Sequence, residues 1–225
     1  MIILDDVAFS KQSWQQRNRI RTAKGLDFLS VPVKTSGRLG QQILECELAS
    51  QPFADKMMKT LRANYSRAPF FGSAIEELAA TMKAGVATGR LVELNCALIS
   101  WMASRLGVTT PMVRASTLGV AGTRGDHVAA ICERVGATHY VSPAGAEDYL
   151  VEDREAFDRR GISVWIQMFE HPEYAQCFAP FMPYASALDL IFSAGPEAAE
   201  VMRSGRRPPR AIGEPSRSNS QEYSA

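Results

Sequence analysis

The sequence lacks the features that would place the protein in a membrane, outside the cell or around a metal ion. No window approaches the roughly 18 unbroken apolar residues of a membrane-spanning helix, and no basic segment followed by a long apolar run opens the chain. The four cysteines, at positions 46, 96, 132 and 177, form no C-x-x-C pair, and the three histidines are scattered. We therefore expect a cytoplasmic protein with reduced thiols, no metal site and no cofactor.

The charge balance also excludes some functions. The formal net charge is +1 at pH 7, which gives no general attraction to nucleic acid or to a membrane surface, so nucleic-acid binding is disfavoured. Neither G-x-S-x-G nor H-E-x-x-H occurs, which argues against the common hydrolase and zinc-protease mechanisms. A chain of 225 residues, 46% of them hydrophobic, is long enough to bury a core without disulfides or metals.

Apolar periodicity predicts strands near the N-terminus and helices in the middle of the chain. Residues 1–4 form an apolar run that ends in two acids, as a buried strand does. Residues 17–33 predict a β-hairpin with its turn at Gly25, and residues 43–48 predict a third strand. Helices are expected over residues 52–65, 75–82 and 91–106.

The second half alternates strands and helices, which indicates right-handed crossovers and a parallel sheet. Strands are expected at the end of residues 110–116 and over 138–142 and 162–166, with helices over 126–135, 152–160 and 188–192. The Arg-, Pro- and Ser-rich residues 204–225 predict a disordered tail. The predicted fold is thus α/β: a single domain over residues 1–203 with a mixed or parallel Rossmann-like sheet, flanking helices and an N-terminal β-hairpin.

The first candidate site surrounds the predicted hairpin. Asp6 follows the first strand, and Lys11, Arg17, Asn18 and Arg19 come next. Strand alternation places Arg17 and Arg19 on one face and Asn18 on the other. Paired guanidinium groups bind phosphate or carboxylate bidentately, and a carboxylate at a strand end can act as a base. The alternative is a solvated hairpin with ordinary surface charges.

A second candidate site is the small-residue loop that follows the strand over residues 138–142. Ser142 and Gly145 would let backbone N–H groups approach a ligand closely, and Tyr149 lies just beyond them. A plain strand-to-helix turn explains the same residues equally well. Arg114, at the end of a short strand, is a further candidate for contact with an anion.

The third candidate site is the segment around His171. Pro172 follows the histidine directly, and Tyr174 lies close by. A histidine in this setting acts as a general acid or base or contacts the substrate, and an ordinary loop histidine is the alternative. The aromatic and proline-rich residues 178–184 favour a packed loop, with a pocket wall or a homodimer contact as the alternatives.

Together these segments resemble the WbqC-like protein family. The likeness covers roughly residues 3–195. The matching stretches, in chain order, are LDDVAFSK (4–11), SWQQRNRI (13–20), LSVPV (29–33), YSRAPFF (65–71), TPMVRAS (110–116), YVSPAG (140–145) with YL (149–150), and EHPEY (170–174) with PY (183–184) and DL (189–190). Members of the family look as if they begin with a further strand and a His-Gln-Pro-type turn, and this segment is missing ahead of Ile3.

The resemblance implies a setting in bacterial polysaccharide or secondary-metabolite biosynthesis, and a group transfer to a nucleotide-linked sugar or a related small molecule. In that reaction Lys11, Arg17 and Arg19 would hold phosphates, and His171 or Asp6 would accept the proton of the nucleophile. The loop from Ser142 to Gly145 would donate N–H groups. The alternatives are a non-catalytic binding or scaffold protein of a biosynthetic complex, and an RNA-binding protein that uses residues 9–21.

Overall fold

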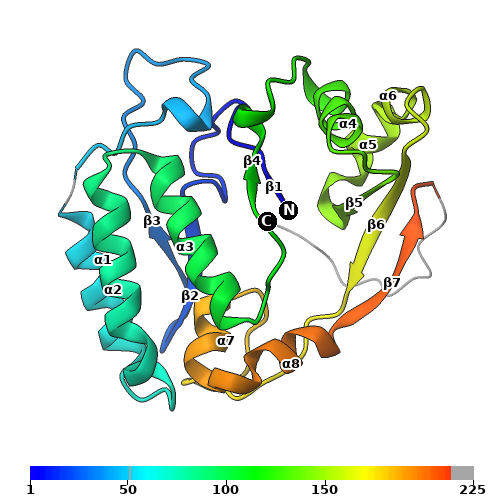
Figure 1. The fold of residues 1–225 in the computed structure, drawn as a ribbon. Helices are drawn as coiled ribbons and strands as arrows, with labels where there is room; N and C mark the ends of the chain where they lie inside the picture. Colours follow the sequence, from blue (N-terminus) through cyan, green and yellow to red (C-terminus); the bar gives the residue numbers. More distant parts are fainter. Residues whose placement is uncertain (51, 214–225) are drawn as a thin grey trace. The chain divides into compact units, whose positions relative to one another are not determined.

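The computed structural model describes residues 1–50 and 52–213, and the chain divides into two compact units (Figure 1). Unit 1 comprises Met1–Ser116 and His171–Gly205, and unit 2 comprises Thr117–Glu170 and the residues from Arg206 onward. Both units combine helices with short strands, and the strands form small parallel, antiparallel and mixed sheets. The predicted α/β class is confirmed, with the strands distributed over several small sheets.

The strands of unit 1 form a hairpin and a short parallel pair. β2 (Arg17–Thr22) and β3 (Gly25–Ser30) are antiparallel, as predicted, with Asn18 opposite Leu29 and Arg19 opposite Phe28. Gly25 has a φ of 124°, which suits glycine at the turn. β1 (Ile2–Ile3) pairs in parallel with β4 (Val113–Arg114), so the first strand and the strand near residue 114 are also confirmed.

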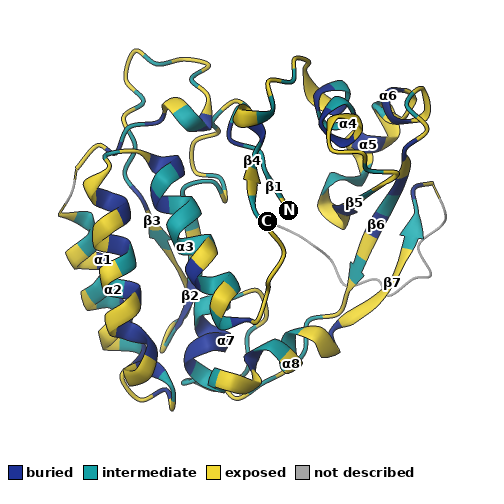
Figure 2. Ribbon diagram, viewed as in Figure 1, coloured by how far each residue is buried: buried dark blue, intermediate teal, exposed yellow. Residues whose placement is uncertain are grey.

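The helices of unit 1 bury one face each (Figure 2). They are α1 (Phe53–Tyr65), α2 (Phe71–Ala87), α3 (Leu91–Arg105), α7 (Ala187–Ala194) and α8 (Ala198–Ser204). In α1, Met57, Leu61 and Tyr65 are spaced by four residues and are all buried, as helical periodicity requires. A Cβ on Gly85 of α2 would lie 2.9 Å from the Cα of Leu94, so glycine lets α2 and α3 approach closely.

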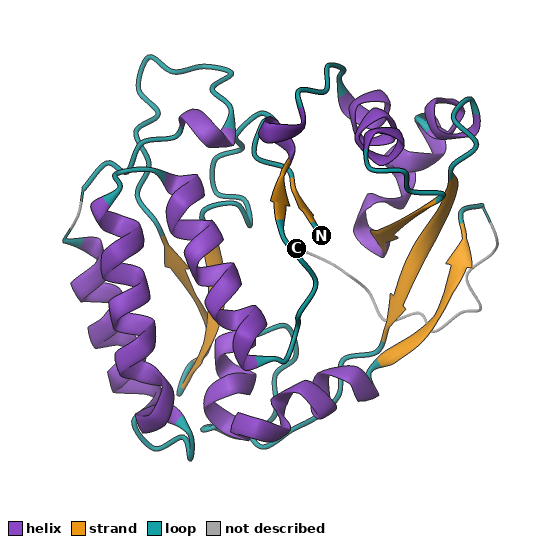
Figure 3. Cartoon of the chain, in the orientation of Figure 1, coloured by secondary structure: helices purple, strands orange, loops and turns teal. Residues whose placement is uncertain are grey.

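Unit 2 is built on a three-stranded mixed sheet (Figure 3). β5 (His139–Pro143) and β7 (Arg206–Ala211) both pair with β6 (Ser163–Phe169), β5 in parallel and β7 antiparallel. The helices are α4 (Arg124–Arg134), α5 (Glu147–Glu152) and α6 (Arg154–Asp158). Their apolar faces surround Phe157 and Ile166, both fully buried, so the unit has a core of its own.

Two predicted elements are wrong in detail. Residues 43–48 do not form one continuous strand: Ile43–Glu45 form a 3-10 turn, and isolated antiparallel bridges follow, from Glu47 to Arg90 and from Leu48 to Val33. The helix predicted over residues 152–160 is present as α6, but it runs only from Arg154 to Asp158, and Glu152 ends the preceding helix α5. The Asp153 carboxylate accepts a hydrogen bond from the N–H of Gly125 at 3.0 Å, which fixes the junction against α4.

The predicted disorder from residue 204 is wrong for the first part of the tail. Arg206–Ala211 form β7, and Ile212 is buried in the core of unit 2. The two prolines of β7 lie beside a register irregularity at the edge of the sheet, where a missing N–H is tolerated. Residues 214–225 of the predicted tail lie outside the described residues.

Over the described ranges, none of the helices combines the length and the apolar character needed to cross a lipid bilayer. All four cysteines are free thiols.

Candidate functional site

One face of the hairpin carries two arginines, each above an aromatic ring. The Cζ of Arg17 lies 4.1 Å from the centre of the Phe28 ring, and the Cζ of Arg19 lies 5.1 Å from the centre of the Trp14 ring. Trp14 and Phe28 are 63% and 41% exposed, so both rings reach solvent. The prediction that the two arginines share one face, with Asn18 on the other, is confirmed. This face presents positive charge and flat apolar surface together.

The positive charges of Arg17 and Arg19 are not matched by carboxylates. Within residues 1–50 and 52–213, neither guanidinium forms an ion pair, and the Nε of Arg19 is buried without a hydrogen-bond partner. An aromatic ring attracts a cation but does not neutralise it. Both charges therefore remain available to an anionic ligand.

A cavity of about 200 Å³ opens in unit 1 between the hairpin and the helices. Its lining runs from residues 14–18, with Trp14 and Asn18 exposed, to side chains of α1, α2 and α3. The deepest of these, Leu61, Leu78 and Leu94, are 0% exposed. We call residues 14–18 with Asn95 the mouth of the cavity, and the three leucines its floor.

Hydrogen bonds hold the mouth in place. The Nδ2 of Asn95 donates to the carbonyl of Gln15 at 2.8 Å, and the Nε2 of Gln16 donates to the carbonyl of Val31 at 3.1 Å. The side chains at the mouth are therefore positioned before a ligand arrives. Of the predicted site residues, Arg17 and Asn18 line this cavity, and Lys11 is exposed in the preceding turn.

Asp5, rather than Asp6, is the buried acid that follows β1. Its carboxylate accepts hydrogen bonds from the Nε of Arg114 at 2.7 Å, the N–H of Ser116 at 3.0 Å and the Oγ of Ser116 at 2.7 Å. Burial alone raises the pKa of Asp5, but these bonds together lower it below its ordinary value. Arg114 also binds Glu93 at 2.5 Å. Two carboxylates thus already hold Arg114, which favours a structural role, and the predicted base Asp6 is half-buried.

His171 lies in a cluster of aromatic rings. Its ring centre is 5.7 Å from that of Phe181 and 5.4 Å from that of Tyr184. Its Nδ1 is 3.0 Å from the carbonyl oxygen of Pro172. A contact with a carbonyl needs a proton on Nδ1, and in the neutral ring this leaves the lone pair on Nε2. The neighbouring rings and the Pro172 carbonyl therefore restrict the orientation of the imidazole.

Tyr174, the other predicted residue of this segment, is tied to a buried acid. Its hydroxyl donates to the Oδ2 of Asp189 at 2.7 Å, and the Nε2 of Gln176 donates to the same oxygen at 2.9 Å. Burial and, second, the charge of Asp189 raise the pKa of Tyr174. Asp189 is 0% exposed in α7, so these bonds anchor the loop around residue 174 to the core.

The remaining predicted residues belong to unit 2. Ser142 is buried at the end of β5, Gly145 is exposed in a 3-10 turn, and Tyr149 is 66% exposed. A Cβ on Gly145 would meet no atom within 4 Å, so the protein itself does not require glycine there. The convergence of all the predicted site residues on a single cleft stays a prediction, because they are divided between the two units.

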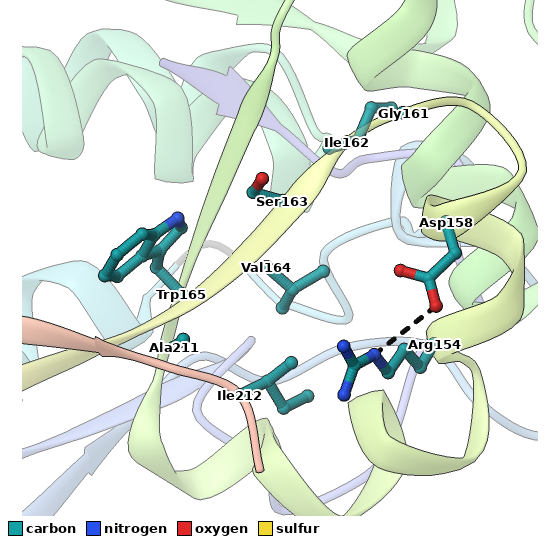
Figure 4. Close-up of a pocket in the computed structure, with 9 residues that line it drawn as sticks. All are labelled: Arg154, Asp158, Gly161, Ile162, Ser163, Val164, Trp165, Ala211 and Ile212. Carbon is teal, nitrogen blue, oxygen red and sulfur yellow. Dashed lines mark ion pairs between the residues drawn. The ribbon is translucent and has the colours of Figure 1, made fainter. Parts of the chain in front are cut away.

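Unit 2 contains a larger cavity of about 380 Å³, beside β6 and the end of β7 (Figure 4). Arg154 and Asp158 of α6 form an ion pair at 3.4 Å on one side of it, and Ser163, Trp165 and Ile212 also line it. No predicted site residue lines this cavity. In the described part of the chain, no three His, Cys, Asp or Glu side chains gather in a way that could hold a metal ion.

Sequence reasoning missed the polar residues that shape the mouth. Asn95 interrupts the apolar surface of a helix whose neighbours Leu94 and Leu98 also line the cavity, and this interruption was the available signal. Asp189 gave a similar signal, as a single acid within an apolar helical run. The leucines and methionines of α1 and α3 recur at helical spacing, and this spacing alone does not reveal that part of them faces a cavity.

Comparisons with known proteins identify a family and a relative. The WbqC-like protein family matches residues 1–201. A Mycobacterium tuberculosis (strain ATCC 25618 / H37Rv) protein named "Uncharacterized protein Rv1507c" is 34% identical over 203 residues, which cover 90% of this chain and 87% of that protein. No solved structure matches the chain at a significant level.

Proposed function

Because the chain belongs to the WbqC-like protein family, we propose that it is a cytoplasmic group transferase for a small, phosphate-bearing molecule. The favoured substrate is a nucleotide-linked sugar of bacterial polysaccharide or secondary-metabolite biosynthesis. One observation carries the proposal: Arg17, with its charge unmatched by a carboxylate, lies at the mouth of a preformed cavity. Arg19 adds a second such charge on the same strand.

Guanidinium groups suit this role because their planar N–H donors match the oxygens of a phosphate. Arg17 would bind the phosphate closest to the cavity, and Arg19 would bind the next one. The amide of Asn18 would orient the group that enters the cavity. The exposed ring of Trp14 offers a stacking surface for a base.

The transfer itself needs a base that removes a proton from the attacking hydroxyl or amine. His171 is the favoured base, because an imidazole is the commonest general base in proteins, and Asp6 is the alternative. Phe181 and Tyr184 pack beside His171 and would limit its rotation.

Binding is tested by calorimetry with nucleoside diphosphate sugars. Replacing Arg17 with glutamine should weaken binding about tenfold or more, because a hydrogen bond to a charged group contributes about 1.5–3 kcal/mol. Lys24→Gln is the matched control, since it removes a charge from the turn of the same hairpin, outside the cavity. Equal affinities for the wild type and Arg17→Gln, or no binding of any nucleotide-linked sugar, would count against the proposal.

Catalysis is tested separately at His171. His171→Gln should reduce turnover by a factor of about 10²–10⁴, the usual contribution of a general base, and leave substrate affinity unchanged. If turnover survives in His171→Gln but not in Asp6→Asn, the base is Asp6.

A second candidate function, binding of single-stranded RNA, is favoured by the exposed Trp14 and Phe28 rings beside two arginines. Bases stack on such rings, and each stacked base contributes about 1–3 kcal/mol. RNA binding would weaken steeply with salt and would be lost in Trp14→Ala. The transferase predicts instead that a single nucleotide-linked sugar is sufficient for binding.

A further inference from the structure

The cavity of unit 1 is lined by residues from two buried clusters of its apolar core. Leu61 and Leu78 belong to one buried cluster, and Met82 and Leu94 belong to the other. All four line the cavity, and Leu98 packs against both clusters. Protein interiors are normally close-packed, and unfilled apolar space removes favourable contacts. A gap at this position is therefore a site that an apolar group can fill.

We propose that the cavity binds an unbranched aliphatic chain, the acyl part of a donor, with its polar head at the mouth beside Arg17, Asn18 and Asn95. The assignment of the aliphatic chain as the transferred group rests on the proposed function. In that transfer the hydroxyl or amine of the acceptor would attack the carbonyl of an acyl thioester and form an ester or amide. The C–S bond would break, and the thiol would leave with a proton. The binding of an aliphatic chain rests only on the cavity.

The apolar lining of the cavity favours an aliphatic chain over a sugar. The floor offers only leucine side chains, so hydroxyl groups placed there would lose their hydrogen bonds to water without replacement. Ser186, a polar residue of the wall, already accepts a hydrogen bond from the N–H of Leu188 at 3.3 Å as the cap of α7. Polar groups that can form further hydrogen bonds occur at the mouth of the cavity. The ligand must therefore have an apolar body and one polar end.

The volume of the cavity limits the length of the aliphatic chain. If one methylene takes about the same space as a water molecule in the liquid, about 30 Å³, then the cavity holds about six or seven methylenes. Met57, Met82 and Met102 line the walls, and their flexible side chains adapt to a thin chain. Leucine-lined cavities of similar size stay dry and bind small apolar molecules.

The experiment is a calorimetric titration of the full-length protein with straight-chain carboxylates from butanoate to dodecanoate. Each added methylene should tighten binding about fourfold until the cavity is full, near octanoate, and longer chains should gain no more. In methyl NMR spectra, octanoate should shift the signals of Met57, Met82 and Met102 and leave that of Met168, in unit 2, unchanged. The matching alkanols should show the same dependence on chain length, which separates the contribution of the aliphatic chain from that of the charged carboxylate.

A variant that fills the cavity supplies the control. Leu98→Phe should weaken octanoate binding more than tenfold, whereas Leu39→Phe, the same change at a fully exposed position, should bind as the wild type does. If Leu98→Phe does not fold, Met102→Phe in the same wall replaces it. Affinity independent of chain length, or equal affinity in the filled variant, overturns the inference. If nucleotide-linked sugars bind and the aliphatic carboxylates do not, this inference is wrong and the proposed function stands. If the carboxylates bind but no octanoyl group is transferred from a thioester, the binding of an aliphatic chain stands and the proposed transfer is wrong.

Discussion

At the scale of single residues, two adjacent acids have different environments. Asp5 is fully buried and accepts every hydrogen bond that Arg114 and Ser116 direct toward it, whereas Asp6 is half-buried. The cluster connects β1 to β4 and, through Glu93, to α3. A buried carboxylate with such partners serves to fix the strands.

Replacing Asp5 with asparagine should lower the free energy of unfolding by about 2–3 kcal/mol, because Arg114 would lose a buried partner. Urea denaturation measures the loss. Asp27→Asn, at an exposed position of the hairpin, is the control and should change stability by less than about 0.5 kcal/mol. A loss as small as that of the control would show that the Asp5 cluster does not stabilise unit 1.

The same carboxylate should make stability depend on pH. The folded protein holds the pKa of Asp5 below its ordinary value, so the unfolded chain binds the proton more tightly. The contribution of Asp5 is therefore complete above about pH 4, near the unfolded pKa, and is lost as the pH falls through the folded pKa. The difference in unfolding free energy between wild type and Asp5→Asn should shrink over that acidic range. A difference that grows on acidification would contradict this assignment.

At the scale of elements, β7 shows how context can outweigh composition. Arginine- and proline-rich residues predict disorder, yet Arg206–Ala211 complete the sheet of unit 2. Arg210 forms a half-buried ion pair with Glu147 of α5, and Ile212 enters the core behind the strand. The strand is held by partners distant in sequence, and local propensity does not report them.

A truncation tests the importance of β7. Ending the chain after Gly205 should remove the hydrogen-exchange protection of β6 on its β7 side and destabilise unit 2, because it uncovers a strand edge and deletes Ile212. Ending it after Gly213 keeps β7 and should leave the protection of β6 as in the full chain. Equal protection in both truncated proteins would mean that β7 does not hold the sheet together.

The elements that sequence did predict are those with regular spacing. α1, α3, the hairpin and the strand that includes Val164 follow helical or alternating apolar patterns, and each is present. The strand expected over residues 43–48 was wrong because a short apolar run does not distinguish a continuous strand from a 3-10 turn followed by isolated bridges. Likewise, Arg17 and Asn18 were found from charge and alternation, but the cavity beside them depends on how three helices pack.

At the scale of the whole molecule, the division into two units bears on stability. The chain passes between the units after Ser116, Glu170 and Gly205, so unit 2 joins an internal segment to the residues that follow α8. Unit 2 has a core around Phe157, whereas Phe192 belongs to a core within unit 1. A single domain over residues 1–203 implies that these cores unfold together, whereas separate cores allow them to unfold one at a time.

We expect the cores to unfold separately. Phe157→Ala should cost about 3–5 kcal/mol, because it empties a fully buried site, and the loss of hydrogen-exchange protection should be confined to β5, β6 and α4. Phe192→Ala, an equally buried phenylalanine of unit 1, should show the reverse pattern and reduce protection in α1 and α2, whose Tyr65 and Phe71 contact its ring. The cavity beside Arg17 lies wholly in unit 1. Phe157→Ala should therefore still bind the ligand at temperatures where unit 2 has lost its hydrogen-exchange protection. If either substitution lowers protection equally in both units, the molecule unfolds as one cooperative domain.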